Sequence, residues 1–398
     1  GDGTTDDTAK ITLAINNASN VYLPTGSYKL STKIDLTGKS VTIYGDGAKL
    51  GRANYSPKTV IISPDSDYAF KTTFPSNCYF KRLSFSGNGI DEMAGTCEEC
   101  DFISTDRGIY YVRGRVTTCY FKCDNYGIYQ AVDSTISNCI FDECGTAISL
   151  HGNDNRIINN RIDWNNLGIE LTGASYNTIE SNLFDRQTTY AITLDNASLY
   201  NNITGNLFER NLVNHISGAI WNTTINSNKF VKKPITDGDP SSEQQPNTAF
   251  AFTEFRNSNL VGNEIYAEKV NDTGIDLSIT STIKGNIVNG YDTDQIRVKI
   301  GDVTIAAGAD GNAQATWSAL KSSILIFANG SHFKLKCLEI IQGSNYVWYN
   351  GSNVIKNVVY DKYYNINITL HNGTADSATY NVYAIFDTIN IFRINFGS

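Results

Sequence analysis

A large apolar residue recurs at nearly constant spacing through the middle of the chain. It returns after 20 to 24 positions, with one longer gap of 35, at Phe121, Phe141, Ile162, Phe184, Phe208, Phe230, Ile265 and Val288. A repeat of this length indicates a solenoid, in which each coil packs only against its neighbours. The long gap contains a polar, proline-rich tract over 232–247, which predicts a loop inserted into one coil.

A second column of the repeat lies two positions before each apolar residue. It reads Cys119, Cys139, Asn160, Asn182, Asn206, Asn228, Asn263 and Asn286. Side chains two apart in a strand share a face, so this column is expected to point inward. Isolated buried amides are costly, whereas amides stacked about 4.8 Å apart can bond to one another and to the turn backbone. The pattern therefore predicts an inward ladder, with drier first coils where cysteine replaces asparagine.

A third column aligns one further strand per coil. Its members are Gly108-Ile-Tyr-Tyr, Gly127-Ile-Tyr-Gln, Ala147-Ile-Ser-Leu, Gly168-Ile-Glu-Leu, Ala191-Ile-Thr-Leu and Gly274-Ile-Asp-Leu. The alternation has period two and is rich in β-branched and aromatic residues, which disfavours a helical solenoid. The leucine consensus of leucine-rich repeats is missing. We predict an all-β fold, a right-handed parallel β-helix.

The two ends of the chain differ from the repeat. Residues 5–18 predict a short amphipathic helix that caps the solenoid, within a cap over 1–20. The β-helix is expected over 21–295. Residues 296–398 are expected to form a separate C-terminal β domain, for trimerisation or carbohydrate binding, with Asn-Gly turns at Asn329, Asn350 and Asn372.

Charge and hydropathy exclude some partners. The net charge of −8 and the pI near 5.1 argue against nucleic acid. The sequence contains no run of eighteen apolar residues, so we expect no membrane insertion. No signal peptide is visible, and the abrupt start on Gly-Asp-Gly leads us to expect a missing N-terminal segment.

The eight cysteines include Cys97-x-x-Cys100, a spacing used by zinc sites. Several of the others recur with the repeat, and no histidine pairs with them. We expect reduced, packed thiols, as in a protein assembled in a cytoplasm, and no metal or other cofactor.

The opening Gly1-Asp-Gly-Thr-Thr-Asp-Asp-Thr8, the helix that follows it and Val21-Tyr-Leu-Pro-Thr-Gly-Ser-Tyr-Lys-Leu30 resemble the start of pectate-lyase-like β-helix domains. The match is closest to bacteriophage tailspike depolymerases, although fungal and plant polysaccharidases share this opening. The resemblance implies a homotrimer on the phage tail, part of the virion, that acts outside the host cell. It also implies binding and cleavage of a bacterial surface polysaccharide, capsule or O-antigen.

Glycoside hydrolysis needs two carboxyl groups, so we searched for acids on outward positions of neighbouring coils. After the Ile of the third column come Tyr110, Tyr129, Ser149, Glu170, Thr193, Trp221, Ala251 and Asp276; after its Leu come Val112, Ala131, His151, Thr172, Asp195, Thr223 and Thr253. Glu170 and Asp195 are diagonal neighbours, with Cα atoms roughly 8 Å apart, which suits an inverting pair. His151 precedes them by one coil, and Tyr129 and Trp221 are expected to bracket them as substrate-binding residues.

A rival column of acids follows the apolar residues of the first column. It contains Asp142, Asp163, Asp185 and Glu209, and the substrate-binding candidates Trp164, Arg186 and Arg210 lie one residue further along. This column is either a cleft for an acidic sugar, a Ca²⁺ site of a lyase, or a solvated turn edge with local Asp–Arg pairs. Asp276 and the loop acids Asp237 and Asp239 are weaker candidates.

Three functions compete on these residues. The leading one is an endo-acting glycosidase; a lyase on the same fold and a glycan-binding adhesin without catalysis are the alternatives. No Ser-His-Asp arrangement is evident among the four histidines, and the glycines form no nucleotide-binding motif.

Overall fold

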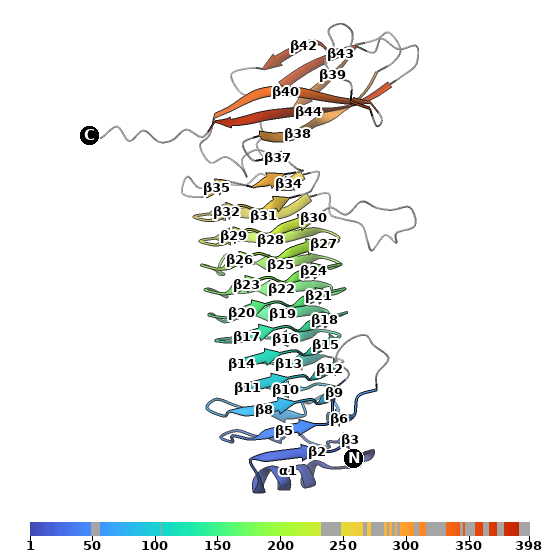
Figure 1. Ribbon diagram of the computed structural model, residues 1–398, viewed down its shortest axis with the longest axis vertical. Coiled ribbons are helices and arrows are strands. Elements are labelled where there is room, and N and C mark those ends of the chain that lie inside the picture. The colour runs from blue at the N-terminus through green and yellow to red at the C-terminus, as the bar shows by residue number, and fades with distance from the viewer. Residues whose placement is uncertain are drawn as a thin grey trace, which may run out of the picture.

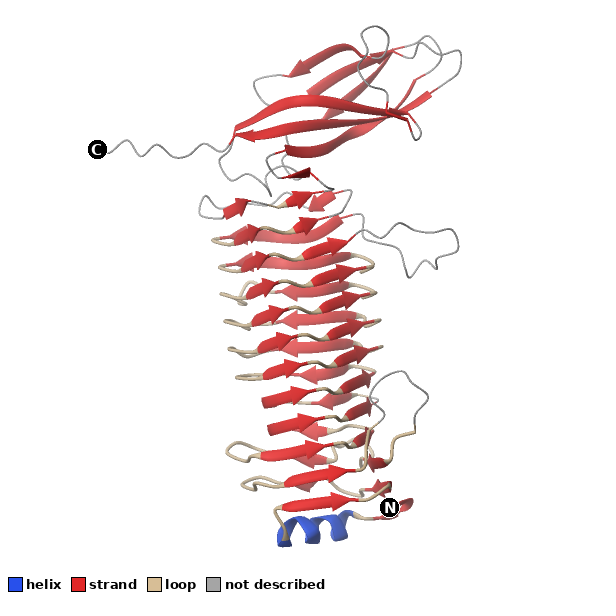
Figure 2. Ribbon diagram, in the orientation of Figure 1, coloured by secondary structure: helices blue, strands red, loops and turns tan. Residues whose placement is uncertain are grey.

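The computed structural model describes residues 1–48, 56–104, 106–231, 248–265, 269–271, 282–284, 286–288, 291–292, 295–305, 310–315, 332–342, 345–346, 355–360, 366–371 and 378–389. In this part of the chain a single helix, α1 (Thr8–Asn17), closes one end of a tall stack of short strands (Figures 1 and 2). Each coil of the stack adds one strand to each of three parallel sheets, which we call A, B and C. Along the chain, the strands of one coil follow in the order sheet B, sheet A, sheet C. The predicted right-handed parallel β-helix is thereby confirmed.

Sheet A contains the strands that begin at the Asn ladder. They are β1 (Asp2–Asp6), β3 (Gly26–Lys29), β6 (Thr59–Ile62), β9 (Ser84–Ser86), β12 (Asp101–Ser104), β15 (Tyr120–Cys123), β18 (Ile140–Asp142), β21 (Arg161–Asp163), β24 (Leu183–Asp185), β27 (Leu207–Glu209), β30 (Lys229–Val231), β33 (Glu264–Ile265), β36 (Ile287–Val288) and the antiparallel β37 (Tyr291–Asp292).

Sheet B precedes sheet A in each coil. Its strands are β2 (Asn20–Leu23), β5 (Thr42–Gly45), β8 (Cys78–Lys81), β11 (Met93–Glu98), β14 (Val112–Thr117), β17 (Thr135–Ser137), β20 (Arg156–Ile158), β23 (Thr178–Glu180), β26 (Asn202–Thr204), β29 (Thr224–Asn226), β32 (Asn259–Val261) and β35 (Thr282–Lys284).

Sheet C follows sheet A and carries the Gly-Ile column. Its strands are β4 (Ile34–Asp35), β7 (Phe70–Lys71), β10 (Ile90–Asp91), β13 (Arg107–Ile109), β16 (Tyr126–Tyr129), β19 (Thr146–Leu150), β22 (Leu167–Leu171), β25 (Tyr190–Leu194), β28 (Asn214–Trp221), β31 (Thr248–Arg256) and β34 (Lys269–Asn271).

Beyond the stack, the described strands pair antiparallel in two further sheets. One contains β38 (Gln295–Ile305), β44 (Ala378–Ile389), β40 (His332–Gln342) and β41 (Asn345–Tyr346), and the other β39 (Asp310–Ala315), β43 (Ile366–His371) and β42 (Ile355–Tyr360). The inserted loop 232–247, the Gly274 strand with Asp276, and the turns at Asn329, Asn350 and Asn372 lie outside the described residues.

The predicted ladder is present at the corner between sheets B and A. The Asn182 Oδ1 accepts hydrogen bonds from the backbone N–H and the side-chain amide of Asn160, at 2.9 and 3.0 Å. Its own amide donates to the Ile157 carbonyl and to Asn206, and the pattern continues to Asn286. These amides lie in the turn rather than in the strand. Every coil thus satisfies the buried polar groups of the coil before it.

Two further inward ladders occupy the other corners, and the sequence analysis did not identify them. Ser134, Asn155, Asn177 and Asn201 are linked side chain to backbone between sheets C and B. Cys144, Asn165, Gln187 and Asn211 are linked in the same way between sheets A and C. Both are visible in the sequence only once the turn positions of each coil are known.

A residue in the left-handed conformation precedes the ladder residue at each corner. Examples are Asn159 (φ 57°), Tyr176 (φ 59°) and Arg186 (φ 59°), one from each corner. This backbone conformation turns the chain by one corner, and it costs free energy in bulky residues.

Aromatic and aliphatic columns fill the interior. Phe102, Phe121 and Phe141 stack with ring centroids 4.7–4.8 Å apart and planes within 6°. Gly127 permits this stack, since a Cβ there would lie 2.7 Å from the Phe141 ring. Rings stacked at the coil spacing fill this part of the core without gaps.

The helix α1 begins later than the sequence suggested. Residues Asp2–Asp6 instead form β1, which pairs with β3, and the N-cap Asp7 makes no side-chain capping bond. Ile11 and Ile15 are buried against the first coil. The helix therefore covers core side chains that the first coil alone would leave in water.

Replacing Asn182 with alanine should lower the free energy of unfolding by about 3 kcal/mol, because it strands two buried donors of Asn160 and the Ile157 carbonyl. Chemical denaturation measures the change. The exposed Asn196→Ala variant is the control and should change stability by less than about 0.5 kcal/mol. Equal effects of the two substitutions would show that the ladder contributes no stability.

His215 makes stability depend on pH. It is buried beside Phe208 and Phe230, and burial lowers its pKa to about 3. The unfolded chain takes up this proton below a pH of about 6.5, so the folded state loses stability as pH falls from there toward 3. The expected loss is about 1.4 kcal/mol per pH unit. Denaturation of His215→Gln across this range should show a smaller slope than the parent; an unchanged slope would contradict the assignment.

Candidate functional site

The outward column of sheet C brings together some of the predicted residues. Strand pairing aligns Tyr129 with Ser149, Ser149 with Glu170, and Glu170 with Thr193. The next member is Ser217, not Trp221. The placement of Trp221 was wrong because β28 extends beyond the repeat pattern, and Trp221 lies at its far end, where its indole donates to Glu254.

The second outward column needs a similar correction. Val112 and Ala131 are adjacent but buried. Thr223 is buried in the corner that follows β28, in line with the ladder of Asn201, so it does not extend the column of His151. Thr253 is exposed at a β-bulge between β28 and β31, where the register shifts.

A chain of hydrogen bonds links Glu170 to His151 through one hydroxyl. The Ser149 hydroxyl donates to Glu170 Oε2 at 2.9 Å and lies 3.0 Å from His151 Nε2. Ser149 is fully buried, and Glu170 contacts the hydroxyl rather than the imidazole. The arrangement is therefore no Ser-His-Glu triad; it orients a half-buried carboxylate and an imidazole at the surface of adjacent coils.

Aromatic rings and a guanidinium lie on the coils before Glu170. The Arg107 guanidinium carbon is 5.3, 5.6 and 4.7 Å from the ring centroids of Tyr110, Tyr126 and Tyr129. Tyr129 in turn lies 5.2 Å from the His151 ring. We call Arg107, Tyr110, Tyr126 and Tyr129 the tyrosine cluster. Such cation–π packing fixes flat apolar surfaces beside a positive charge.

The charge of Glu170 acts on one residue of the tyrosine cluster. Burial raises the pKa of Tyr126, and the negative charge of Glu170 raises it further. Burial also raises the pKa of Tyr68, which lies near Arg107, to about 12. Sequence analysis missed Arg107, although it directly precedes Gly108 of the Gly-Ile column, as Tyr126 precedes Gly127.

A groove continues from the cluster toward sheet B. One hollow of about 410 Å³ is lined by Tyr110, Gln130, Arg113 and Phe74 among others. A second, of about 620 Å³, shares Arg113 and Phe74 and includes Asp133. Gly95 and Gly114 line it, and a Cβ at Gly114 would lie 2.1 Å from the Gly95 carbonyl oxygen. Glycine at these positions lets the backbones of successive coils pack closely on the wall of the hollow.

Asp195 is the diagonal neighbour of Glu170, as predicted, because it lies two residues beyond Thr193. Its carboxylate accepts hydrogen bonds from the Gly173 N–H at 3.0 Å, the Ala197 N–H at 3.1 Å and the Ser198 hydroxyl at 2.6 Å. These donors belong to the turns of two successive coils. Asp195 therefore has a structural role, because it links the two turns.

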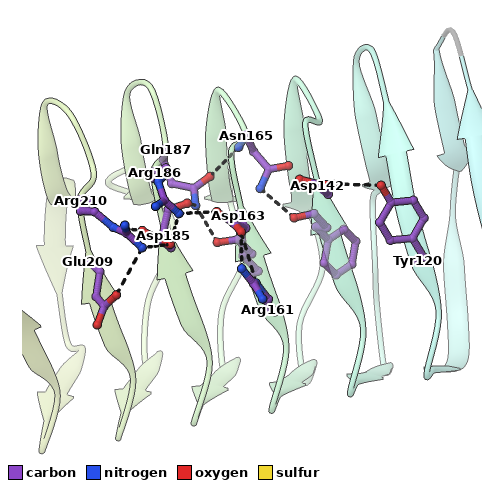
Figure 3. Close-up of polar contacts among 12 residues, drawn as sticks. Tyr120, Asp142, Arg161, Asp163, Asn165, Asp185, Arg186, Gln187, Glu209 and Arg210 are labelled. Atoms are coloured by element: carbon purple, nitrogen blue, oxygen red, sulfur yellow. Dashed lines mark hydrogen bonds and ion pairs between the residues drawn. The ribbon is translucent and has the colours of Figure 1, made fainter. Parts of the chain in front are cut away.

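Three of the four acids in the rival column are buried and Glu209 is half-buried, which corrects the idea of a solvated turn edge. Figure 3 shows the side chains that contact them. Asp142, Asp163 and Asp185 are only 1–2% exposed, although they point away from the core. Tyr120 donates to Asp142 at 3.0 Å, and Arg161 contacts Asp163 at 2.8 Å. Long side chains of the same strand and of neighbouring coils thus cover the carboxylates.

Arginines on the adjacent corner complete this row. Arg210 forms two hydrogen bonds to Asp185, at 2.8 and 2.5 Å, and contacts Glu209 at 3.8 Å. Arg186 contacts Asp185 at 2.7 Å and lies 4.7 Å above the Trp164 ring. The expected Asp–Arg pairs are present, and these groups already bind one another (Figure 3). Their packing favours a structural role for the row.

The described part of the chain contains no group of three or more His, Cys, Asp or Glu side chains suited to a metal ion. Seven cysteines, from Cys78 to Cys144, are free and buried, as expected for packed thiols. Burial raises the pKa of Cys97 and Cys100 well above the usual value. No helix among the described residues is long and apolar enough to span a bilayer.

Two family models match the sequence. Residues 1–71 match the rhamnogalacturonase A/epimerase, pectate lyase-like model, and residues 109–240 match the right-handed beta helix region. These matches confirm the resemblance to pectate-lyase-like β-helix domains. No curated protein matches the chain.

Solved structures of similar fold come from phage tailspikes and a glucanase. The enzymatically active domain of tailspike protein 2 of bacteriophage CBA120 is 12% identical, covers 95% of this chain and 77% of its own, and has a TM-score of 0.57. A mutant tailspike protein of E. coli bacteriophage HK620 in complex with a pentasaccharide is 10% identical and has a TM-score of 0.52. The match covers 98% of this chain and 91% of that protein. The catalytic unit of a GH87 alpha-1,3-glucanase from Streptomyces thermodiastaticus is 16% identical and has a TM-score of 0.54. The match covers 73% of this chain and 61% of that unit. At these identities the likeness establishes the fold, and this chain spans 61% of the glucanase unit.

The structural role of the acidic row can be tested by mutation. Asp185→Asn should lower the free energy of unfolding by about 3–5 kcal/mol, because it leaves Arg186 and Arg210 without their shared buried carboxylate. The control is Glu143→Gln, which breaks the exposed Lys122–Glu143 pair of the same sheet and should cost less than about 1 kcal/mol. Unchanged stability of Asp185→Asn, together with lost polysaccharide cleavage, would return the row to the catalytic candidates.

Proposed function

We propose that this protein binds a polysaccharide along the outer face of sheet C and cleaves it at Glu170. The observation that carries the proposal is the tyrosine cluster next to the Ser149-linked Glu170 and His151. Sugars present flat apolar faces and hydroxyl groups, so their sites combine aromatic rings with carboxylates and amides. The groove at Tyr110 extends this surface for a chain of several sugars.

The polymer we infer is a bacterial surface polysaccharide, a capsule or an O-antigen. The fold likeness to two phage tailspikes supports this inference, as does the tailspike-like opening of the sequence. In this proposal the protein is a homotrimeric component of a phage tail that acts outside the host cell. The C-terminal strands from β38 onward would form the domain over 296–398 that serves trimerisation or carbohydrate binding.

For hydrolysis, we assign the proton donor to Glu170. It would protonate the leaving glycosidic oxygen while Asp195 accepts a proton from the water that attacks the anomeric carbon. The glycosidic bond breaks, the water oxygen bonds to the sugar, and the two carboxyl groups exchange protonation states. Ser149 orients Glu170, and the diagonal placement of Asp195 supports a pair separated widely enough to admit this water.

A lyase is the second candidate, and one observation favours it. Arg107, Tyr129 and His151 lie in contact beside Glu170, whereas Asp195 is engaged by three donors of its turns. In β-elimination, an arginine neutralises a uronate carboxylate and an imidazole or phenolate removes the adjacent carbon-bound proton. The C–O bond to the leaving sugar then breaks, the leaving oxygen takes up a proton, and the remaining uronate carries a carbon–carbon double bond.

Glu170→Gln should reduce cleavage by a hundredfold or more while binding is retained, because the amide cannot transfer the proton. Purified capsular and O-antigen polysaccharides from typed strains provide the substrates, and mass spectrometry of oligosaccharides measures cleavage. Glu180→Gln, on the sheet B strand that directly follows the Glu170 strand in the chain, is the matched control and should keep full activity.

The products separate the alternatives. New reducing ends without ultraviolet absorbance indicate hydrolysis, and an absorbing unsaturated uronate indicates elimination. Binding without any product from the parent protein would reveal an adhesin. Full activity of Glu170→Gln would rule out Glu170 as the acid and direct attention to the row of Asp163, Asp185 and Glu209.

A further inference from the structure

Two exposed tyrosines form a stacked pair at the corner between sheets C and B. Tyr176 is 56% exposed and Tyr200 is 50% exposed. Their ring centroids are 5.1 Å apart and their planes differ by 8°, so the rings follow the spacing of successive coils. The pair lies around the corner from the outward face of Glu170, on the same coil and the next. The catalytic proposal makes no use of it.

The backbone at both tyrosines is in the left-handed region, with φ of 59° and 58°. Equivalent positions on neighbouring coils carry Asp133, Asp154, Asn222 and Asn257, which have similar φ values. Aspartate and asparagine tolerate this conformation, whereas bulky residues adopt it at a cost in free energy. Stacking of the two rings offsets part of that cost, yet about half of each side chain stays exposed to water. Exposed aromatic faces held on a fixed turn indicate a role in binding.

The turns that carry the pair are fixed by hydrogen bonds. Asp195 joins the Gly173 turn, which leads to Tyr176, to the Ala197–Ser198 turn, which leads to Tyr200. The backbone N–H of Tyr176 donates to the Leu199 carbonyl at 3.0 Å. The rings are therefore held in place before any ligand arrives, which lowers the entropy that binding must remove.

We propose that Tyr176 and Tyr200 form a second glycan-binding site, which grips pyranose rings of the polysaccharide outside the Glu170 site. The proposal rests on the proposed function, since it takes the same polymer as ligand. The flanking positions of the column carry the short polar side chains Asp154 and Asn222. Sugar rings can stack on the outer faces of the tyrosine pair while these side chains bond to hydroxyl groups.

The surroundings favour a glycan over a second protein. Among the described residues, the exposed large apolar side chains are Leu13, Tyr22, Phe74, Ile103, Tyr176, Tyr200 and Val213. Only Phe74 shares this corner, five coils before Tyr176. It lines the 620 Å³ hollow with Asp133, which lies two coils before Tyr176. Two rings among polar residues offer too little area for a stable protein interface, which needs about 1,000 Å² or more. Phe74 and the tyrosine pair instead mark a line along the corner, as a linear polymer requires.

The site can be tested without strain on the fold. Tyr176→Asn and Tyr200→Asn each install a residue type that the same column already carries at Asn222 and Asn257. The double variant is made in the Glu170→Gln background, which binds without cleavage. Calorimetry with the purified capsular or O-antigen polysaccharide that the Glu170→Gln protein binds measures affinity. Tyr22→Asn, which removes another exposed stacked tyrosine near the capped end, is the control.

The double variant should bind the polysaccharide about tenfold more weakly, equivalent to ~1.4 kcal/mol. In the catalytically competent protein, the same pair of substitutions should leave cleavage of short oligosaccharides unchanged and slow cleavage of the long polymer. Unchanged affinity would overturn the second site while leaving the proposed function intact. A changed oligomeric state with unchanged affinity, seen by analytical ultracentrifugation, would also overturn it, because the pair would then contact another copy of the chain. Failure of the parent protein to bind any polysaccharide would overturn both proposals.

Discussion

The structure depends on how each corner disposes of its buried polar groups. A coil of three short strands must turn three times, and each turn leaves backbone N–H groups inside the solenoid. Side-chain oxygens of the next coil accept these hydrogens at all three corners, as Asn160, Asn165 and Asn155 do for the residues before them. A coil is therefore complete only when its successor is in place. This requirement fixes the register of all three sheets at once.

Register in turn determines the chemistry of the outer surface. Because every coil adds one residue to each column, side chains that are about twenty positions apart become neighbours. Ser149 thereby meets Glu170, and Arg107 lies over the ring of Tyr129. The same rule on sheet A stacks acids of like charge, and there arginines from the neighbouring corner cover them. The side chains on the outer face of sheet C remain partly exposed, whereas those on sheet A pair with one another.

The sequence predicted the parts of this arrangement that repeat strictly. The coil period, the Asn ladder and the diagonal neighbours Glu170 and Asp195 follow from counting. Trp221 was misplaced because β28 extends several residues beyond the repeated strand, so that Ser217 rather than Trp221 pairs with Thr193. The burial of Asp163 and Asp185 was missed because it depends on where the long side chains of Arg161, Arg186 and Arg210 lie, and periodicity carries no information on rotamers. The hydrogen bonds between Asp195 and the backbone of the turns were not predicted for the same reason.

The ladder passes undisturbed across the coil that carries the inserted segment. Asn228 and Asn263 are 35 positions apart, yet Asn228 bonds to Asn263 at 2.9 and 3.0 Å, as it would in a coil of 22 residues. The ladder therefore depends on the residues at the corners and not on the number of residues between them. Such a molecule can gain, lose or exchange surface segments one coil at a time while its axis stays the same. New recognition surfaces can therefore arise here by local insertion, without a new fold.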